Sequence, residues 1–225
     1  MPRQSRRAPG GVIYHVLNRA AGKAELFRSD ADYAAFIKVL AETMERTPIR
    51  LCAYCLMPTH WHLVLWPQED GQLAQFMQRL TITHVRRWVE FRNRVGLGAV
   101  YQGRYKSFPI QDDAHFTTVV RYVERNPLRA GKVRRAERWL WSSLNPAGSG
   151  DIPQIPLSRW PVSRRSDWLE WVNQPQTKAE EEAVRRSLQY SRPYGAAPWT
   201  ARMETLLKIG PLRPPGRPRN EPKVE

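Results

Sequence analysis

Two histidines, His60 and His62, interrupt an otherwise apolar segment at residues 56–67 that has the composition of a buried strand. Successive residues of a strand point to opposite faces of its sheet, so we expect both imidazoles on one face and Trp61 on the other. Imidazoles at positions i and i+2 can converge on one metal ion. The alternative is that both are hydrogen-bonded polar side chains on a half-exposed strand, without any ligand.

A second candidate group lies about sixty residues further on, in a segment that we expect to be helical, residues 112–126. Tyr122 falls outside the apolar stripe of this helix, and Asn126 and His115 lie on the same side as Tyr122. A phenol can serve as a nucleophile, and a carboxamide oxygen can bind the same ion as the histidines. The alternative is that this row is a solvated helix face. The apolar stripe itself consists of Phe116, Val119, Val120 and Val123.

The charge of the chain favours a polyanionic partner. The 225 residues contain 36 Lys and Arg against 21 Asp and Glu, a net charge of +15, which favours nucleic acid. A membrane is the weaker alternative, because no apolar run reaches the roughly 18 residues of a transmembrane helix. The basic start, residues 1–10, is not followed by the apolar block of a secretory signal, so we expect a cytoplasmic protein.

The only two cysteines, Cys52 and Cys55, do not predict a metal site. No second C-x-x-C motif accompanies them. Three positions apart on a predicted strand, they are expected to face opposite ways, and we interpret them as core thiols.

The periodicity predicts an α+β fold with a ferredoxin-like, antiparallel β-α-β-β-α-β order. Residues 49–57 and the histidine strand are expected to form a hairpin across Pro58 and Thr59. A further helix follows the last strand. The expected strands cover residues 11–19, 49–57, 60–66 and 101–111, and the expected helices begin at residue 29 or 30, at residue 73 and at residue 112.

The composition divides the chain into five parts. A basic tail, residues 1–10, precedes the main domain, residues 11–144. Residues 145–176 are rich in proline and read as a long, partly ordered connection. Residues 177–210 are expected to form two helices, the first opened by a capping box of Thr177 and Glu180. Residues 211–225 are rich in Pro and Arg, and we expect them to be disordered when free.

The motifs together resemble a known family. The segments Y-H-V-L-N-R, Y-C-L-M-P-T-H-W-H-L-V, Y-Q-G-R-Y-K-S-F-P-I and R-Y-V-E-R-N-P-L-R-A-G-K-V occur in an order that resembles the REP-associated tyrosine transposases of bacteria. These are single-tyrosine HUH-type transposases of the IS200-like superfamily. The H-x-H motif alone is weak, but the ordered set is specific and covers about residues 12–210. Residues 11–144 would then be the catalytic domain, and residues 177–210 a DNA-binding extension.

The resemblance implies a single-strand DNA endonuclease and strand transferase that acts on hairpin-forming palindromic repeats. Tyr122 would attack a phosphate and form a 5′-phosphotyrosine intermediate. His60 and His62, with Asn126 as third ligand, would hold Mg²⁺ or Mn²⁺. His115 could assist, although the family does not require it. No nucleotide cofactor is expected, and no G-x-x-x-x-G-K-[ST] loop is present. The expected location is the bacterial cytoplasm, in association with the nucleoid; monomer and homodimer both remain open.

The alternative function is a non-cleaving binder of structured single-stranded DNA or RNA, which would need neither the histidines nor Tyr122. DNA contacts are expected from basic residues near the candidate site and in the tail, although each is also consistent with a solvated surface. These candidates are Arg79, Arg86, Arg87, Arg104, Lys106, Arg121, Arg125, Arg129, Arg217 and Arg219.

Overall fold

A four-stranded antiparallel sheet forms the centre of the protein. The computed structural model describes residues 7–145 and 154–212. The strands are β1 (Ile13–Arg19), β2 (Arg50–Met57), β3 (His60–Trp66) and β4 (Lys106–Ile110), in the spatial order β2-β3-β1-β4. Every neighbouring pair is antiparallel. The predicted α+β fold with ferredoxin-like strand order is therefore confirmed.

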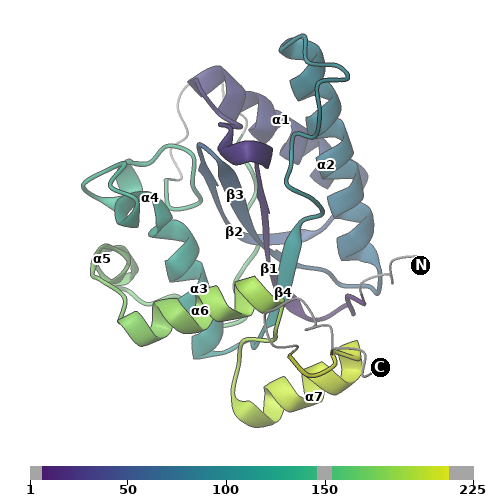
Figure 1. Ribbon diagram of the computed structural model, residues 1–225. Helices are drawn as coiled ribbons and strands as arrows, with labels where there is room; N and C mark the ends of the chain where they lie inside the picture. The colour runs from purple at the N-terminus through teal and green to yellow at the C-terminus, as the bar shows by residue number, and fades with distance from the viewer. Residues whose placement is uncertain (1–6, 146–153, 213–225) are drawn as a thin grey trace, which may run out of the picture.

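Helices cover both faces of this sheet (Figure 1). After the short 3₁₀ turn η1 (Ala21–Lys23), α1 (Asp30–Arg46) and α2 (Gln72–Phe91) pack on one face, and α3 (Ala114–Glu124) packs on the other. Within the part of the chain that the structure describes, no helix combines the length and apolar character that crossing a membrane requires.

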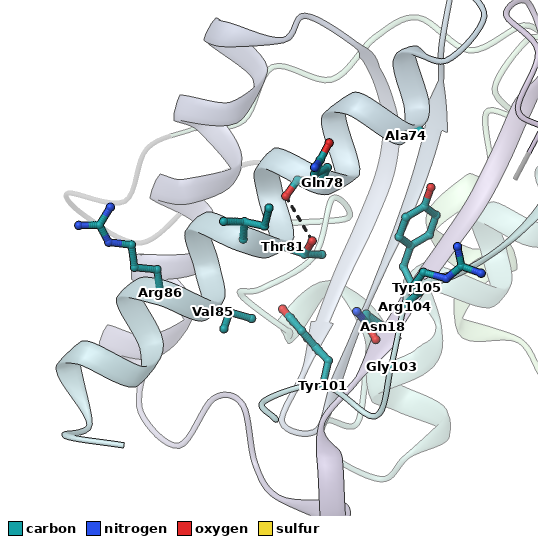
Figure 2. Close-up of a pocket in the computed structure, with 11 residues that line it drawn as sticks. Asn18, Ala74, Gln78, Thr81, Val85, Arg86, Tyr101, Gly103, Arg104 and Tyr105 are labelled. Carbon is teal, nitrogen blue, oxygen red and sulfur yellow. Dashed lines mark hydrogen bonds between the residues drawn. The ribbon is translucent and has the colours of Figure 1, made fainter. Parts of the chain in front are cut away.

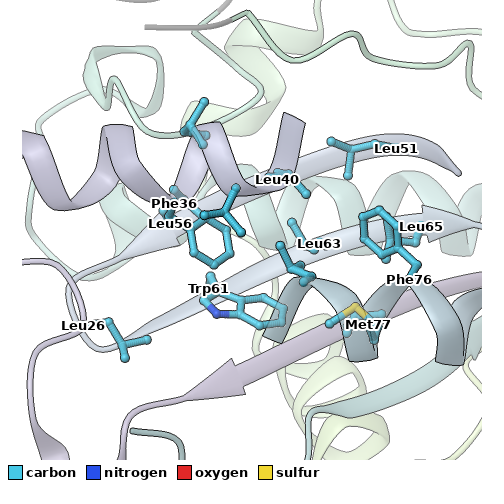
Figure 3. Close-up of a cluster of buried hydrophobic side chains, with 14 of the residues drawn as sticks. Leu26, Phe36, Leu40, Leu51, Leu56, Trp61, Leu63, Leu65, Phe76 and Met77 are labelled. Atoms are coloured by element: carbon cyan, nitrogen blue, oxygen red, sulfur yellow. The ribbon is translucent and has the colours of Figure 1, made fainter. Parts of the chain in front are cut away.

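The alternation of β3 divides its side chains between two cores. Trp61, Leu63 and Leu65 are fully buried against α1 and α2 (Figure 3). The Trp61 indole N–H also donates a hydrogen bond of 2.9 Å to the hydroxyl of Tyr101. Val64 faces the other core, beneath α3. This period of two is the reason that both site histidines lie on the α3 face.

The β2–β3 hairpin turns at Pro58 and Thr59, as predicted. Its register shifts between Leu51 and Ala53, where β2 is irregular. The prediction that Cys52 and Cys55 face opposite ways is therefore wrong: both are buried in the core cluster beneath α3. A β-bulge adds one residue to a strand and so reverses the expected alternation beyond it. Both thiols are free and buried, as expected of core cysteines.

Two predicted elements are shorter than the sequence pattern suggests. β4 covers only Lys106–Ile110, and Tyr101 contributes an isolated bridge to Ala20 instead. The helix predicted to end at Asn126 is divided: α3 ends at Glu124, and α4 (Asn126–Arg129) follows directly. Pro127 lies in the first turn of α4, where a missing backbone N–H costs little.

The C-terminal part packs against the α3 side of the sheet. After η2 (Ala136–Arg138), the segment predicted as a long, partly ordered connection contains α5 (Trp168–Asn173). Trp168 is buried, and the Trp160 indole N–H bonds the Cys52 carbonyl at 3.0 Å. Proline content alone predicted a loop, but the tryptophans anchor this segment. The predicted capping box of Thr177 and Glu180 opens α6 (Lys178–Tyr190), which contacts α3 and β4 and precedes α7 (Ala197–Leu207).

Candidate active site

The two histidines of β3 lie on the face that α3 covers. His62 pairs across the sheet with Leu17 of β1 and Cys55 of β2, and it is 1% exposed. His60, two residues earlier and nearer the strand end, is half-buried. Their ring centroids are 5.0 Å apart, with the rings nearly perpendicular. The predicted placement of both imidazoles on one face is confirmed.

Helices α3 and α4 bring Tyr122 and Asn126 to these histidines. The Tyr122 ring lies 6.1 Å from the His62 ring, edge to face, and Tyr122 is 4% exposed. The Asn126 amide Nδ2 lies 2.8 Å from His62 Nε2. The structure thus brings together all four residues that the sequence analysis selected as catalytic or metal-ligating.

A third histidine, His15 of β1, joins the site from the neighbouring strand. His15 Nε2 lies 2.8 Å from Nδ1 of His62, and both rings are fully buried. When the Asn126 amide donates to His62 Nε2, the His62 proton must sit on Nδ1 and point to His15. The remaining nitrogen, His15 Nδ1, is buried and has no hydrogen-bond partner among the described residues.

The environment keeps these imidazoles neutral. Burial is the main cause that lowers the pKa of His62 well below its usual range and the pKa of His60 to about 4, and the positive charges of Arg19 and Arg129 add to it. Burial likewise lowers the pKa of His15 to about 3. Neutral imidazoles keep a lone pair, which is the form that binds metal ions.

A basic cleft opens beside Tyr122 and is called here the Tyr122 cleft. Its volume is about 690 Å³, and none of its lining residues is acidic. The Arg129 guanidinium lies 4.2 Å from the centroid of the Tyr122 ring. A cleft of this charge beside a phenol is suited to hold a phosphate. Its basic lining side chains are Arg19, Arg104, Lys106, Arg129 and Arg185.

The sequence model of the IS200-like transposases matches residues 10–126 of the chain, which is more than half of its length and includes His60, His62, Tyr122 and Asn126. The chain belongs to this family. Its members are enzymes that cut and rejoin DNA. A protein of Haemophilus influenzae described as a REP-associated tyrosine transposase is 26% identical over 119 residues, which are 49% of this chain and 67% of that relative.

A solved structure of a REP-associated tyrosine transposase bound to a REP hairpin is also similar to this transposase-family chain. Its TM-score is 0.46 at 18% identity, and the match covers 72% of this chain and 99% of that one. The family resemblance drawn from the ordered motifs is confirmed by the family match.

This family member uses two of its predicted DNA-binding arginines inside the fold. Arg121 donates to the backbone carbonyls of Gln174 and Pro175, at 2.9 and 3.2 Å. Arg125 donates to the carbonyls of Val172 and Asn173, at 3.0 and 2.7 Å. Both guanidinium groups therefore hold the α5 segment against α3, and their predicted DNA contacts stay predictions.

The other predicted DNA-binding residues that the structure describes lie in the Tyr122 cleft or on α2. Arg104, Lys106 and Arg129 line the Tyr122 cleft, whereas Arg79, Arg86 and Arg87 are exposed on α2. Arg86 and Arg87 pair with Glu90 and Glu42. Arg217 and Arg219 lie outside the described residues. The sequence analysis missed Arg19 and Arg185, because their place beside Tyr122 depends on packing between distant segments.

His115 lies apart from the histidine pair. It stands at the start of α3, where its Nδ1 is 2.7 Å from an Asp113 carboxylate oxygen and its ring contacts Tyr194. Seven helical residues, about 10 Å, separate it from Tyr122. Within residues 7–145 and 154–212, no group of three or more His, Cys, Asp or Glu side chains could hold a metal ion. The candidate ligand set is therefore mixed: two imidazoles and one carboxamide.

Proposed function

We propose that this chain is a metal-dependent tyrosine transposase that cuts and rejoins single-stranded DNA at hairpin-forming repeats. The observation that carries the proposal is the position of Tyr122, whose ring lies 6.1 Å from His62 at the wall of a cleft lined by five basic side chains. The match to the IS200-like transposase family and the relative described as a REP-associated tyrosine transposase support repeat DNA as the substrate.

The chemical step is a phosphotransesterification at Tyr122. The phenol oxygen loses its proton and forms a bond to phosphorus, while the bond from phosphorus to the 3′ oxygen breaks. That oxygen takes up a proton and leaves as a free 3′-hydroxyl, and the DNA stays attached as a 5′-phosphotyrosine. One ester replaces another, so rejoining needs no nucleotide cofactor. Arg129 and Arg19 would neutralise charge on the phosphate oxygens.

The neutral histidines and Asn126 fit a divalent ion. His62 presents the lone pair of Nε2. Among the described residues, the His60 ring makes a hydrogen bond through Nδ1 alone, 3.0 Å from the Thr59 hydroxyl. Rotation of the Asn126 amide by half a turn exchanges Nδ2 for Oδ1 and would present an oxygen ligand beside His62 Nε2. Bound between these three side chains, Mg²⁺ or Mn²⁺ would polarise the scissile phosphate. Imidazole ligands favour Mn²⁺ over Mg²⁺.

His15 acts in this proposal as a positioning residue for His62. A histidine that binds a metal through Nε2 must carry its proton on Nδ1, and this N–H normally finds an acceptor that fixes the ring. Here His15 Nε2 is that acceptor, at 2.8 Å. The cost is one buried N–H on His15 Nδ1 without a partner. Such a cost in a core is typical of a functional site.

The test is a covalent trapping experiment. The protein is incubated with 3′-labelled hairpin oligonucleotides carrying single-stranded flanks, with Mn²⁺ or with EDTA, and then denatured. We expect a labelled adduct only with the ion. Binding without an adduct, over a range of hairpins and flanks that includes the palindromic repeats of the source genome, would favour the non-cleaving alternative.

A further inference from the structure

An apolar groove lies between α2 and the segment Tyr101–Tyr105, and is called here the α2 groove (Figure 2). Its volume is about 700 Å³. Gln78 and Val85 of α2 lie on one side, and the Tyr101 ring lies on the other. Ile82, which also lines the groove, is 59% exposed. No part of the chemistry at Tyr122 uses this surface.

The floor of the α2 groove is rigid and aromatic. The Tyr101 hydroxyl accepts from the Trp61 indole at 2.9 Å and lies 2.6 Å from His84 Nδ1, so its ring orientation is fixed. Tyr105 adds a second ring beside it. A preformed aromatic surface binds flat, unsaturated ligands at little entropic cost.

The α2 groove is continuous with the Tyr122 cleft around the edge of the sheet. Asn18, Gly103 and Arg104 line both. A Cβ atom built on Gly103 would meet no atom within 4 Å, so this position leaves the passage open. A strand that occupies the cleft would therefore reach the groove by passing over Gly103.

The charge of the α2 groove favours some kinds of ligand over others. Its two charged lining residues, Arg86 and Arg104, are both basic. Arg104 has no ion-pair partner among the described residues, and the Asn18 side-chain N–H groups make no hydrogen bond to them. Aromatic rings, an amide with available N–H groups and arginines together match a nucleotide strand, because bases stack on the rings while phosphates meet the cations. A lipid or an apolar peptide would match the floor alone.

We propose that the α2 groove binds unpaired bases of single-stranded DNA next to the phosphate held at Tyr122. The inference rests on the proposed function, since the strand enters the groove from the Tyr122 cleft. It adds a second binding site on the opposite face of the sheet, in which Tyr101, Tyr105 and Ile82 contact the bases and Arg104 contacts the backbone at the junction.

The first test compares Ile82→Glu with Leu169→Glu. Both positions are exposed and helical, at 59% and 42%, and both changes add the same charge, but Leu169 on α5 lines neither site. The probe is labelled oligo(dT) of about 12 nucleotides, followed by fluorescence anisotropy in EDTA. We expect Ile82→Glu to weaken binding about fivefold or more, since stacking on aromatic residues contributes ~1–3 kcal/mol per base. Leu169→Glu reports the charge effect alone.

Equal affinities of the two variants would overturn the proposal. The proposal would also be overturned if light scattering showed a dimer for the wild type and a monomer for Ile82→Glu. The groove would then bind a second copy of the chain. Covalent trapping separates this inference from the proposed function. If the wild type forms an adduct but Ile82→Glu binds oligo(dT) as tightly as the control variant, only the groove proposal is wrong. If Ile82→Glu binds oligo(dT) more weakly but the wild type forms no adduct, only the cleavage chemistry is wrong.

A second measurement locates the bases directly. Single-stranded oligonucleotides with 5-iododeoxyuridine at successive positions are irradiated on the full-length protein, and crosslinked peptides are identified by mass spectrometry. We expect crosslinks at Tyr101 or Tyr105 from at least one position. Crosslinks confined to peptides outside residues 74–105 would contradict the assignment of the groove.

Discussion

His62 Nδ1 lies 2.8 Å from His15 Nε2, and this buried contact joins the two central strands of the sheet at the site. Asn126 occupies the other nitrogen of His62 at the same distance, 2.8 Å. With both ring nitrogens engaged, His62 has one orientation and one tautomer, which is the tautomer that a metal ligand needs. The His60 ring contacts that of His62, and its one hydrogen bond among the described residues is to the Thr59 hydroxyl.

Substitution of His15 should lower metal affinity without touching any ligand. In His15→Leu, His62 Nδ1–H loses its acceptor, and we expect Mn²⁺ to bind about 10- to 100-fold more weakly. His15→Gln should recover part of the affinity, because its carbonyl oxygen can accept the same hydrogen bond. The measurement is Mn²⁺ binding by electron paramagnetic resonance, without DNA.

The matched control is His84→Leu. His84 is as buried as His15, but it lies on the other face of the sheet and bonds Tyr101. Both variants should lose stability, since each loses a buried hydrogen bond worth about 1–3 kcal/mol. Equal Mn²⁺ affinities for His15→Leu and His84→Leu would show that His15 does not position His62 for metal binding.

Asn126→Ala should raise the Mn²⁺ concentration that half-saturates adduct formation, by about tenfold. The reason is that the alanine methyl group supplies no oxygen to the ion that His62 and His60 would hold in the proposed function. Asn173→Ala is the control, since this asparagine of α5 donates to Glu137 of η2 and lies away from the histidines. A metal titration identical in both variants would show that another group completes the site.

The structure separates arginines that line the Tyr122 cleft from arginines that hold the fold together. Arg104→Gln should weaken single-strand binding and reduce the slope of log affinity against log salt by about 1, as expected for a lost phosphate contact. Arg121→Gln should instead lower the unfolding free energy by roughly 1–3 kcal/mol, because it leaves the Gln174 and Pro175 carbonyls unpaired. A reduced salt slope in Arg121→Gln, with stability unchanged, would reverse these roles.

Stability should fall as the solution becomes acidic, and His84 carries part of this effect. Burial lowers the pKa of His84 to about 3, so the unfolded state, with a pKa near 6.5, binds more protons below that pH. The stabilising contribution is complete above pH 6.5 and is lost as the pH falls towards 3. At pH 5 the loss should be on the order of 2 kcal/mol, measured by urea unfolding. In His84→Leu the unfolding free energy should decline less steeply as the pH falls. Parallel pH curves for the wild type and this variant would contradict the role of His84.

The local sequence pattern was sufficient to predict the strand and the helix that hold the site residues. Alternation placed His60 and His62 on one face, and helical periodicity placed Tyr122 and Asn126 on one side, before any partner of either group was known. These inferences hold because the periods of strands and helices are properties of the backbone. The same reasoning failed at Cys52, where a bulge in β2 changes the alternation.

Contacts between distant segments were beyond the sequence. His15 lies within the strand that was predicted over residues 11–19, but its contact with His62 follows from the register in which Leu17 pairs with His62. Arg185 reaches the Tyr122 cleft because α6 packs across α3 and β4. α5 was missed because six residues between prolines show little periodicity, and its burial depends on Trp168 meeting Trp160.

The identity of the nucleophile is decided by the peptide that becomes linked to DNA. Tyr122→Phe keeps the ring that packs against His62 and Arg129, so stability should change by less than about 1 kcal/mol and DNA binding should persist. Mass spectrometry of the wild-type adduct should find the DNA on the peptide that contains Tyr122, and Tyr122→Phe should give no adduct. An adduct on Tyr101, Tyr105 or any other residue, or an adduct that survives in Tyr122→Phe, would contradict the assignment of Tyr122 as nucleophile.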